Sequence, residues 1–233
     1  MSDRAVSSIV YFEGEGRRNL VQVIRTVKKA FRKRSDIRTY KLVIFTAHGE
    51  GPAIAYNQLQ EYDPQIIAVT FPPSFFIKRG EEIIHPHIHP KLRAFFNGVN
   101  VRVITGRLPF DQVEGIQVHN DQMKLIRDVL SLFGGSFELC VQAVLQACDT
   151  GAVEIGEKVV GMSGDCAAII TASTTQKFLS IKEGLAINEI LCKPRNLTIA
   201  RRKAPAEPAR ARSLFEPSGP ALTPRAPKIL PKG

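Results

Sequence analysis

The chain has 233 residues, a net charge of +10 and 44% hydrophobic residues. A folded body of about 200 residues buries roughly 70% of its unfolded surface, so it needs neither disulfides nor a metal to be stable. No apolar run approaches the ~20 residues of a membrane helix and no signal peptide opens the chain, so we expect a cytoplasmic protein without membrane contact. The four cysteines lack metal-ligand spacing, which predicts buried, reduced thiols.

The first half of the chain alternates short apolar runs with helical patterns. Runs typical of buried strands lie at residues 8–12, 42–45, 66–70 and 101–105. Apolar residues at helical spacing predict helices at residues 20–31, 52–61 and 92–96. Residues 74–90 are predicted to be irregular. The alternation predicts an α/β fold with a mostly parallel, doubly wound sheet and helices on both of its faces.

The second half of the folded body begins with two helices. Apolar faces predict helices at residues 123–133 and 137–148, separated by two glycines. Ser136 directly precedes the second helix and is placed to cap it. Further strands are predicted at residues 158–161, 167–172 and 185–191.

The composition changes near residue 201. Residues 201–233 contain seven of the fifteen prolines and eight Lys or Arg against two Glu, with too few apolar residues for a core. We therefore assign residues 1–197 to one α/β domain and residues 198–233 to a basic, Pro/Ala/Arg-rich disordered tail. Such a tail can bind polyanions non-specifically, but it offers no aromatic platform beyond Phe215 for nucleic-acid bases.

A glycine-containing turn in residues 41–56, KLVIFTAHGEGPAIAY, joins a predicted strand to a helix that Pro52 opens. The free N–H groups and the dipole at a helix N-terminus attract anions such as phosphate. Similar polar turns follow the other predicted strands, and doubly wound sheets bind ligands at such strand ends. The residues expected to bind a ligand are Gly16, Asn19, Thr46, His48, Gly49, Gly51, Thr70, Thr105, Gly106, Ser163, Gly164 and Asp165.

His48 and Asp165 are the candidate acid/base groups if the protein is an enzyme. His48 could donate to an anion or transfer a proton, although the sequence names no partner that would orient it. Cys166, next to Asp165, is a candidate nucleophile, but its turn favours packing. Acids near these turns, Glu13, Glu15 and Glu50, would repel a bare phosphate. If they face the site, they suit a divalent cation such as Mg²⁺ or a cationic ligand.

Two other motifs are weaker indications of a binding site. The pair Gly14 and Gly16 follows a strand, but Asn19 takes the place of the third glycine of a dinucleotide fingerprint, so NAD binding is not expected. His85, His87 and His89 would share one side of an extended segment and could chelate a transition metal. The flanking prolines and the long loop favour a solvated flap instead, and we predict no metal site.

Several blocks of the sequence resemble the C-terminal domain of pyruvate kinase and the stand-alone bacterial and archaeal proteins that are built like it. The blocks are FTAHGEGPAIAYNQLQEYDPQIIAVT (45–70), VQAVLQACDTGAVEIGEKVVGMSGDCAAIITAS (141–173) and EILCKPRN (189–196), and residues 12–19 resemble the opening of the stand-alone proteins. The resemblance is scattered over residues 8–197. His48 replaces the usual Ser and Leu20 replaces a Thr, and residues 164–168 also depart from the family pattern; each change removes a hydroxyl that could bind an anion.

The resemblance implies a domain that binds a small effector, because many pyruvate kinases bind a sugar phosphate there. The phosphoryl-transfer chemistry of that family lies in a (β/α)₈ barrel of typically ~250 residues, so we expect no pyruvate kinase activity from this chain alone. We expect it to bind a phosphorylated or carboxylated metabolite. The alternative is an uncharacterised enzyme that acts on a phosphorylated metabolite through His48 and Asp165. Nucleic-acid binding by the tail and the first helix, and homo-oligomer formation, stay open.

Overall fold

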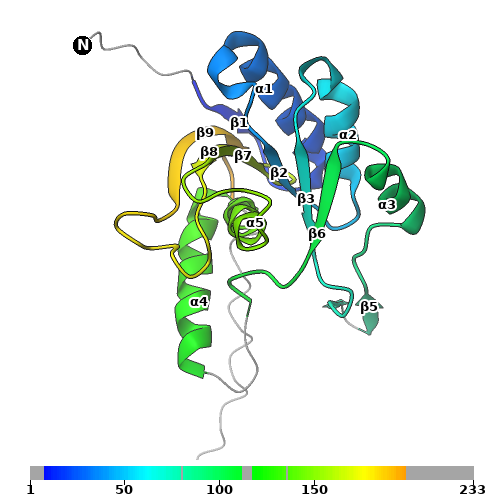
Figure 1. Ribbon diagram of the computed structural model, residues 1–233. Coiled ribbons are helices and arrows are strands. Elements are labelled where there is room, and N and C mark those ends of the chain that lie inside the picture. Colours follow the sequence, from blue (N-terminus) through cyan, green and yellow to red (C-terminus); the bar gives the residue numbers. More distant parts are fainter. Residues whose placement is uncertain (1–7, 80, 112–116, 135, 198–233) are drawn as a thin grey trace, which may run out of the picture. The chain divides into compact units, whose positions relative to one another are not determined.

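A seven-stranded mixed sheet with helices on both faces forms the body of the protein in the computed structural model, which describes residues 8–79, 81–111, 117–134 and 136–197 (Figure 1). The strands, in their order across the sheet, are β1 (Val10–Phe12), β9 (Ala186–Pro194), β8 (Ala167–Thr171), β7 (Lys158–Met162), β2 (Leu42–Phe45), β3 (Ile66–Thr70) and β6 (Val101–Thr105). The predicted α/β class is thereby confirmed.

Most neighbouring strands in the sheet run parallel. The pairs β1–β9, β7–β2, β2–β3 and β3–β6 are parallel, whereas β8 runs antiparallel to both β7 and β9. Every strand of this sheet except β8 therefore ends at the same edge, which we call the carboxyl edge. Turns that are far apart in the sequence meet there.

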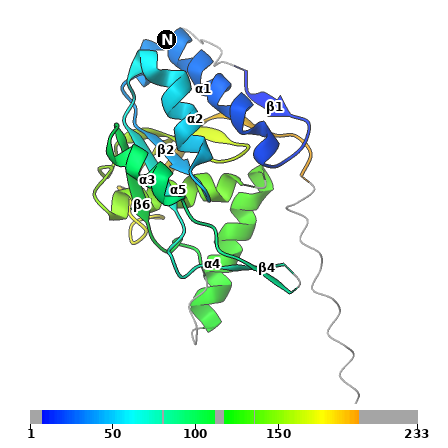
Figure 2. The same ribbon diagram turned by 90° about the vertical axis from the view of Figure 1, so that its right-hand side faces the viewer.

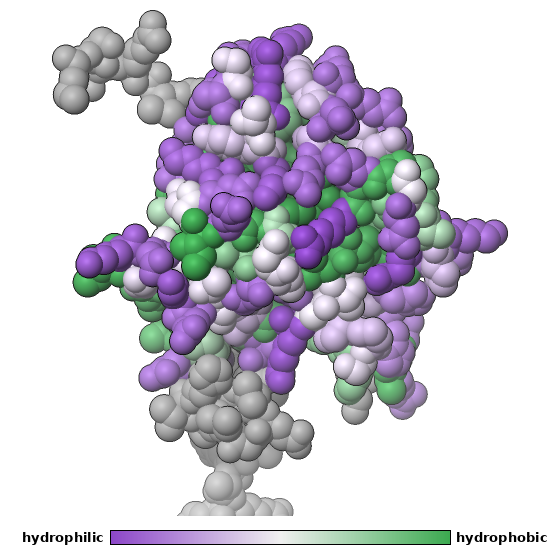
Figure 3. Space-filling view, viewed as in Figure 1, coloured by the Kyte–Doolittle hydropathy of each residue, from purple (hydrophilic) through white to green (hydrophobic). Residues whose placement is uncertain are grey.

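Helices cover both faces of the sheet, as Figures 1 and 2 show. On one face lie α1 (Leu20–Lys33), α2 (Glu50–Leu59) and α3 (Pro90–Asn97), which share one hydrophobic core. On the other face lie α4 (Gln117–Leu130) and α5 (Phe137–Asp149), which share a second core. In the space-filling view, hydrophobic residues form a band across the middle of the face, at the level of the sheet (Figure 3).

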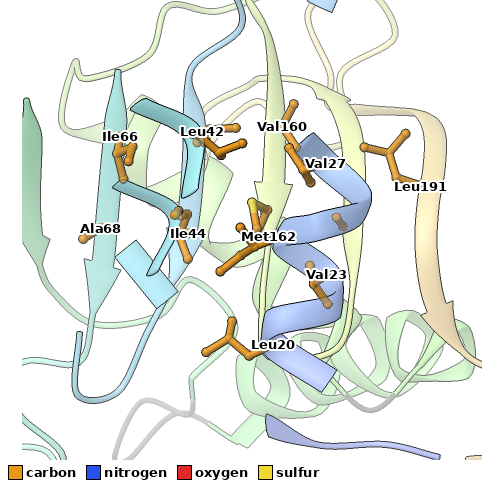
Figure 4. Packing of buried hydrophobic residues seen from close by; sticks show 14 of the residues in the cluster. Leu20, Val23, Val27, Leu42, Ile44, Ile66, Ala68, Val160, Met162 and Leu191 are labelled. Atoms are coloured by element: carbon orange, nitrogen blue, oxygen red, sulfur yellow. The ribbon is translucent and has the colours of Figure 1, made fainter. Parts of the chain in front are cut away.

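Alternating residues of the strands supply the two cores. Leu42 and Ile44 of β2 belong to the first core, and Val43 between them belongs to the second. Figure 4 shows how α1 uses this surface: its residues Leu20, Val23 and Val27 lie over side chains of β2, β7 and β9. Strands buried on both faces explain the short, fully apolar runs in the sequence.

Helix α5 lies close to the sheet because β7 carries a glycine beneath it. A Cβ atom at Gly161 would come within 3.2 Å of Val144 Cγ2 on α5 and within 2.9 Å of Ile170 Cδ1 on β8. The helix is correspondingly buried, and its residues 140–148 include no exposed side chain. Its closely packed first turn reaches the carboxyl edge.

Several predicted boundaries differ from the observed ones. Helix α2 begins at Glu50, before Pro52, and passes into a 3₁₀ turn (Gln60–Tyr62) after Leu59. Strand β9 continues to Pro194 because it pairs with both β8 and β1. The segment predicted to be irregular contains a hairpin of β4 (Ile77–Arg79) and β5 (Glu82–Ile84). Its three-residue strands are too short to stand out from a loop by periodicity.

The cysteine and membrane predictions can also be compared with the described residues. All four cysteines are free and buried, which confirms the prediction of reduced core thiols. Within the described part of the chain, no helix has the length and apolar character needed to cross a bilayer. The predicted tail, residues 198–233, lies outside the described residues.

Candidate functional site

The order of strands reverses between β2 and β7. From β2 the chain passes through α2 on one face to β3 and through α3 to β6, and it returns through α5 on the opposite face to β7. Crossover helices that leave on opposite faces open a crevice at the carboxyl ends of the two central strands. A cleft of about 280 Å³ lies at this point.

Three turns and the start of α5 line this cleft. The turns follow β1, β2 and β7, so residues about 150 positions apart in the sequence face one another. The lining residues are Glu15, Gly16, Arg17, Leu20, Phe45, Thr46, Ala47, His48, Glu50, Ser136, Leu139, Gly164 and Asp165. Five of the residues expected from the sequence are among them: Gly16, Thr46, His48, Gly164 and Asp165.

Asp165 ties the turns of the cleft together. It is only 1% exposed, and its Oδ2 accepts a hydrogen bond from the Gly16 N–H at 2.7 Å. Its Oδ1 accepts from the Ser136 hydroxyl and lies 3.3 Å from the Cys166 Sγ. Ser136 donates its one hydroxyl proton to Asp165, so Ser163 must be the donor in the 2.6 Å contact between the two serine oxygens. One buried carboxylate thus joins the turn after β1, the start of α5 and its own turn after β7.

The predicted capping role of Ser136 is wrong. Ser136 stands at the N-cap position of α5, but its side chain makes no capping hydrogen bond. Its hydroxyl instead bonds Asp165 and Ser163. The hydroxyl proton is directed to Asp165 because a hydrogen bond to a carboxylate is about twice as strong as one to a neutral group. The Ser136 oxygen accepts from Ser163 and from no main-chain N–H of the helix. Asp165 therefore places its negative charge at the positive ends of α5 and of the 3₁₀ turn (Arg17–Asn19) that leads into α1.

The turn after β2 depends on a glycine with a left-handed backbone. Gly49 has φ 93°, and its N–H donates to the Thr46 Oγ1 at 2.9 Å. A Cβ atom at Gly49 would lie 2.7 Å from the Leu92 Cδ2. Gly51 is buried below the turn, where a Cβ atom would lie 3.1 Å from the Ile44 Cγ2. Gly49 and Gly51 therefore shape the turn and do not line the cleft.

His48 has an orienting partner that the sequence did not name. The exposed ring places Nδ1 3.3 Å from the main-chain oxygen of His87. A carbonyl oxygen only accepts hydrogen bonds, so this contact requires a proton on Nδ1 and leaves Nε2 of the neutral ring as an acceptor. The ring is thus held in the form that a general base needs.

Arg17 and Glu50 form an ion pair between the first and second turns. The Arg17 Nη2 lies 2.5 Å from the Glu50 Oε1, and the two side chains are 69% and 34% exposed. An exposed pair of this kind contributes at most about 1 kcal/mol, so an incoming anion can displace Glu50 at little cost. Arg17 is the cationic side chain among the residues that line the cleft.

Acidic residues outnumber basic ones in the cleft. Glu15, Glu50 and Asp165 line it together with Arg17. Of the predicted acids, Glu13 is not among the lining residues; its carbonyl accepts a hydrogen bond from Asn196. The described residues contain no group of three or more His, Cys, Asp or Glu that could hold a metal ion. A Mg²⁺ ion would therefore need phosphate oxygens of a ligand in addition to one or two carboxylates.

Thr70, Thr105 and Gly106 lie at the carboxyl edge but not in this cleft. The Gly106 N–H donates to the Thr70 carbonyl at 3.2 Å, and the Thr105 Oγ1 accepts from Arg93. Helices α2 and α3, which connect β2, β3 and β6, lie on the same face of the sheet, so no crevice from a reversal forms at β3 and β6. The sequence predicted one pocket shared by all the turns at this edge, but the turns after β3 and β6 do not contribute to the cleft.

The remaining candidate residues, which are Asn19, Cys166 and three histidines, do not line the cleft. The Asn19 side-chain amide donates to the Gly14 carbonyl at 2.6 Å and closes the first turn. Burial raises the pKa of the Cys166 thiol far above its usual range, so this thiol does not supply a thiolate nucleophile. The ring nitrogens of His85, His87 and His89 contact three different main-chain groups, and the three side chains are exposed.

Sequence reasoning missed Arg17, Ser136 and Leu139. A signal for the latter two was present, because a helix that connects two parallel strands begins at the carboxyl edge of the sheet. A search of models of known protein families finds none that matches this chain. What the cleft binds is therefore inferred from its own chemistry.

Proposed function

We propose that the protein binds a small phosphorylated or carboxylated metabolite in the cleft at the carboxyl ends of β2 and β7. The observation that carries this proposal is the position of the cleft, where the strand order reverses and the N-terminal ends of α1, α2 and α5 converge. Each helix N-terminus acts as about half a positive charge toward an anion. The resemblance to the effector-binding domain of pyruvate kinase supports the same ligand class.

The contacts of Asp165 indicate which part of the cleft would receive the anion. Asp165 already takes the N–H of Gly16 and the hydroxyl of Ser136. The first turn of α2, in contrast, has no side-chain cap and lies next to His48 and Arg17. A ligand anion bound there would replace Glu50 as the partner of Arg17. The released Glu50 carboxylate could then hold a Mg²⁺ ion that arrives with a phosphate.

A thermal-shift screen tests this proposal with sugar phosphates, nucleotides and carboxylates, each with and without Mg²⁺. A ligand at about a hundred times its Kd stabilises the native state by about 2.7 kcal/mol, which raises Tm by roughly 5–10 °C for a body of this size. We expect the Arg17→Gln and His48→Ala variants to lose most of this shift. The matched control is Arg25→Gln, because Arg25 is exposed on α1 outside the lining of the cleft.

Two outcomes would refute the binding proposal. One is that no compound class raises Tm for the full chain. The other is that the same compound raises Tm equally in Arg17→Gln and in Arg25→Gln, because the ligand would then bind outside this cleft.

A second candidate function follows from the orientation of His48. We propose, as the alternative, an enzyme that acts on a phosphorylated metabolite with His48 as the acid/base group, because the His87 carbonyl fixes its tautomer. Asp165 would position the turns in this reaction, since both of its oxygens already accept hydrogen bonds. Turnover of the stabilising compound should then fall by about 10²–10⁴-fold in His48→Ala. Absence of turnover in the wild-type protein would leave the binding function alone.

A further inference from the structure

A second cleft, of about 580 Å³, opens beyond the carboxyl ends of β3 and β6. This volume lies within the range of small-molecule sites. The described residues that line it come from the segment after β3, the segment after β6 and helix α4: Pro72, Ser74, Phe75, Phe76, Arg107, Asp111 and Arg127. None of them lines the cleft between β2 and β7.

Two arginines give the second cleft a cationic character. Arg127 of α4 has a buried Nε without a hydrogen-bond partner in the part of the chain that the structure describes. Leaving a buried donor unpaired is unfavourable, so a ligand acceptor at this place would be stabilising. Arg107, which also lines the cleft, is exposed and available to the same ligand.

Asp111 offsets the positive charge of these two arginines only in part. The ion pairs of the described residues include none that joins Asp111 to Arg107 or Arg127. Burial raises the pKa of the Asp111 carboxyl, and the two arginines only partly oppose this rise. Two guanidinium groups beside one carboxyl leave a surplus of positive charge in the cleft.

Aromatic rings also line the second cleft. The rings of Phe75 and Phe71 stack with centroids 4.0 Å apart and an interplanar angle of 2°. Phe71 in turn meets the ring of Phe45 edge-on at 5.1 Å. These contacts hold Phe75 in place. The Phe76 ring contacts the ring of His85, with centroids 6.1 Å apart, and is still 48% exposed. Such a surface suits a flat apolar group.

We propose that this second cleft binds an anion that carries an aromatic ring, an aryl carboxylate or an aryl phosphate. Arg107 and Arg127 bind the acidic oxygens, for which the forked guanidinium group is suited, and the ring of the ligand packs on Phe75 and Phe76. The site goes beyond the proposed function, because it uses other residues and adds an aromatic requirement.

Calorimetric titration of the full chain with phenyl phosphate and with benzoate tests this site. At least one of the two should bind, and Arg107→Gln and Arg127→Gln should each weaken that binding about tenfold or more. Phe76→Ala should weaken the binding of the aryl anion but not the binding of inorganic phosphate. Arg102→Gln is the matched control, because Arg102 is an exposed arginine of β6 outside the cleft. Arg17→Gln should also leave the affinity unchanged.

Three results would overturn the second site. The first is that neither aryl anion binds at millimolar concentration. The second is equal affinity in Arg107→Gln and Arg102→Gln; Arg107 is exposed, so its loss leaves the fold intact. The third is loss of binding in Arg17→Gln, which would place the aryl anion in the first cleft. Failure of the first cleft to bind any metabolite would leave these outcomes unaffected.

Discussion

The Asp165→Ala variant is expected to lose about 3–5 kcal/mol of unfolding free energy, because each of two hydrogen bonds to a charged group contributes about 1.5–3 kcal/mol. The carboxylate is 1% exposed and accepts hydrogen bonds from Gly16 and Ser136, which belong to different turns of the cleft. Its removal leaves a partly buried N–H and a partly buried hydroxyl without their charged acceptor. Urea unfolding followed by circular dichroism measures the change. The stability of Asp165→Asn should lie between that of the wild-type protein and that of Asp165→Ala, because an amide oxygen can replace only one of the carboxylate oxygens.

Asp149→Ala is the matched control for this variant. Asp149 also accepts hydrogen bonds from a main-chain N–H and a hydroxyl, both of Thr175, but it is exposed to water. Water can replace its lost bonds, so we expect a loss of about 1 kcal/mol or less. If Asp165→Ala and Asp149→Ala lost equal free energy, Asp165 would not be the group that joins the turns.

The Gly49→Ala variant is expected to lose about 2–4 kcal/mol of unfolding free energy. The backbone at Gly49 has φ 93°, and the new methyl group would overlap the Leu92 side chain, with Ile88 and Phe96 close behind it. Both effects disturb the turn that leads into α2. Metabolite binding in the first cleft should weaken in parallel, because His48 and Glu50 flank this residue.

Gly151→Ala is the control that separates the effect of backbone strain from the effect of steric overlap by the new methyl group. Gly151 also has a positive φ, of 66°, but a Cβ atom there would meet no atom within 4 Å. This control carries strain alone, and we expect it to lose about 1 kcal/mol. Equal losses in the two variants would mean that the packing of Gly49 against α3 and the segment before it contributes nothing.

The sequence was sufficient for the elements that are buried on both faces. The runs at residues 42–45 and 66–70 are apolar throughout because each side of the sheet carries a core, and they coincide with β2 and β3. The helical spacing in residues 20–31 likewise matches α1. Short elements such as β4 and β5 were missed because three residues contain too little periodicity.

The composition of the cleft could be predicted only in part. The turns after β1, β2 and β7 were recognised individually by their glycines and polar residues. The order of the strands in the sheet, however, could not be predicted from the sequence. In the structure β2 lies between β3 and β7, and β6 lies beyond β3. Thr70 and Thr105 were therefore assigned to a site that they do not line. Arg107 and Arg127, which line the second cleft, stand isolated in the sequence and gave no signal.

The central claim is that the turns after β1, β2 and β7 bind one ligand together. Titration of the ¹⁵N-labelled full chain with the sugar phosphate that raises Tm most tests this claim directly. The amide resonances of Gly16, His48 and Gly164, one from each turn, should shift together along a single binding curve. Shifts confined to residues 201–233, or a curve in which one of the three turns does not take part, would contradict it.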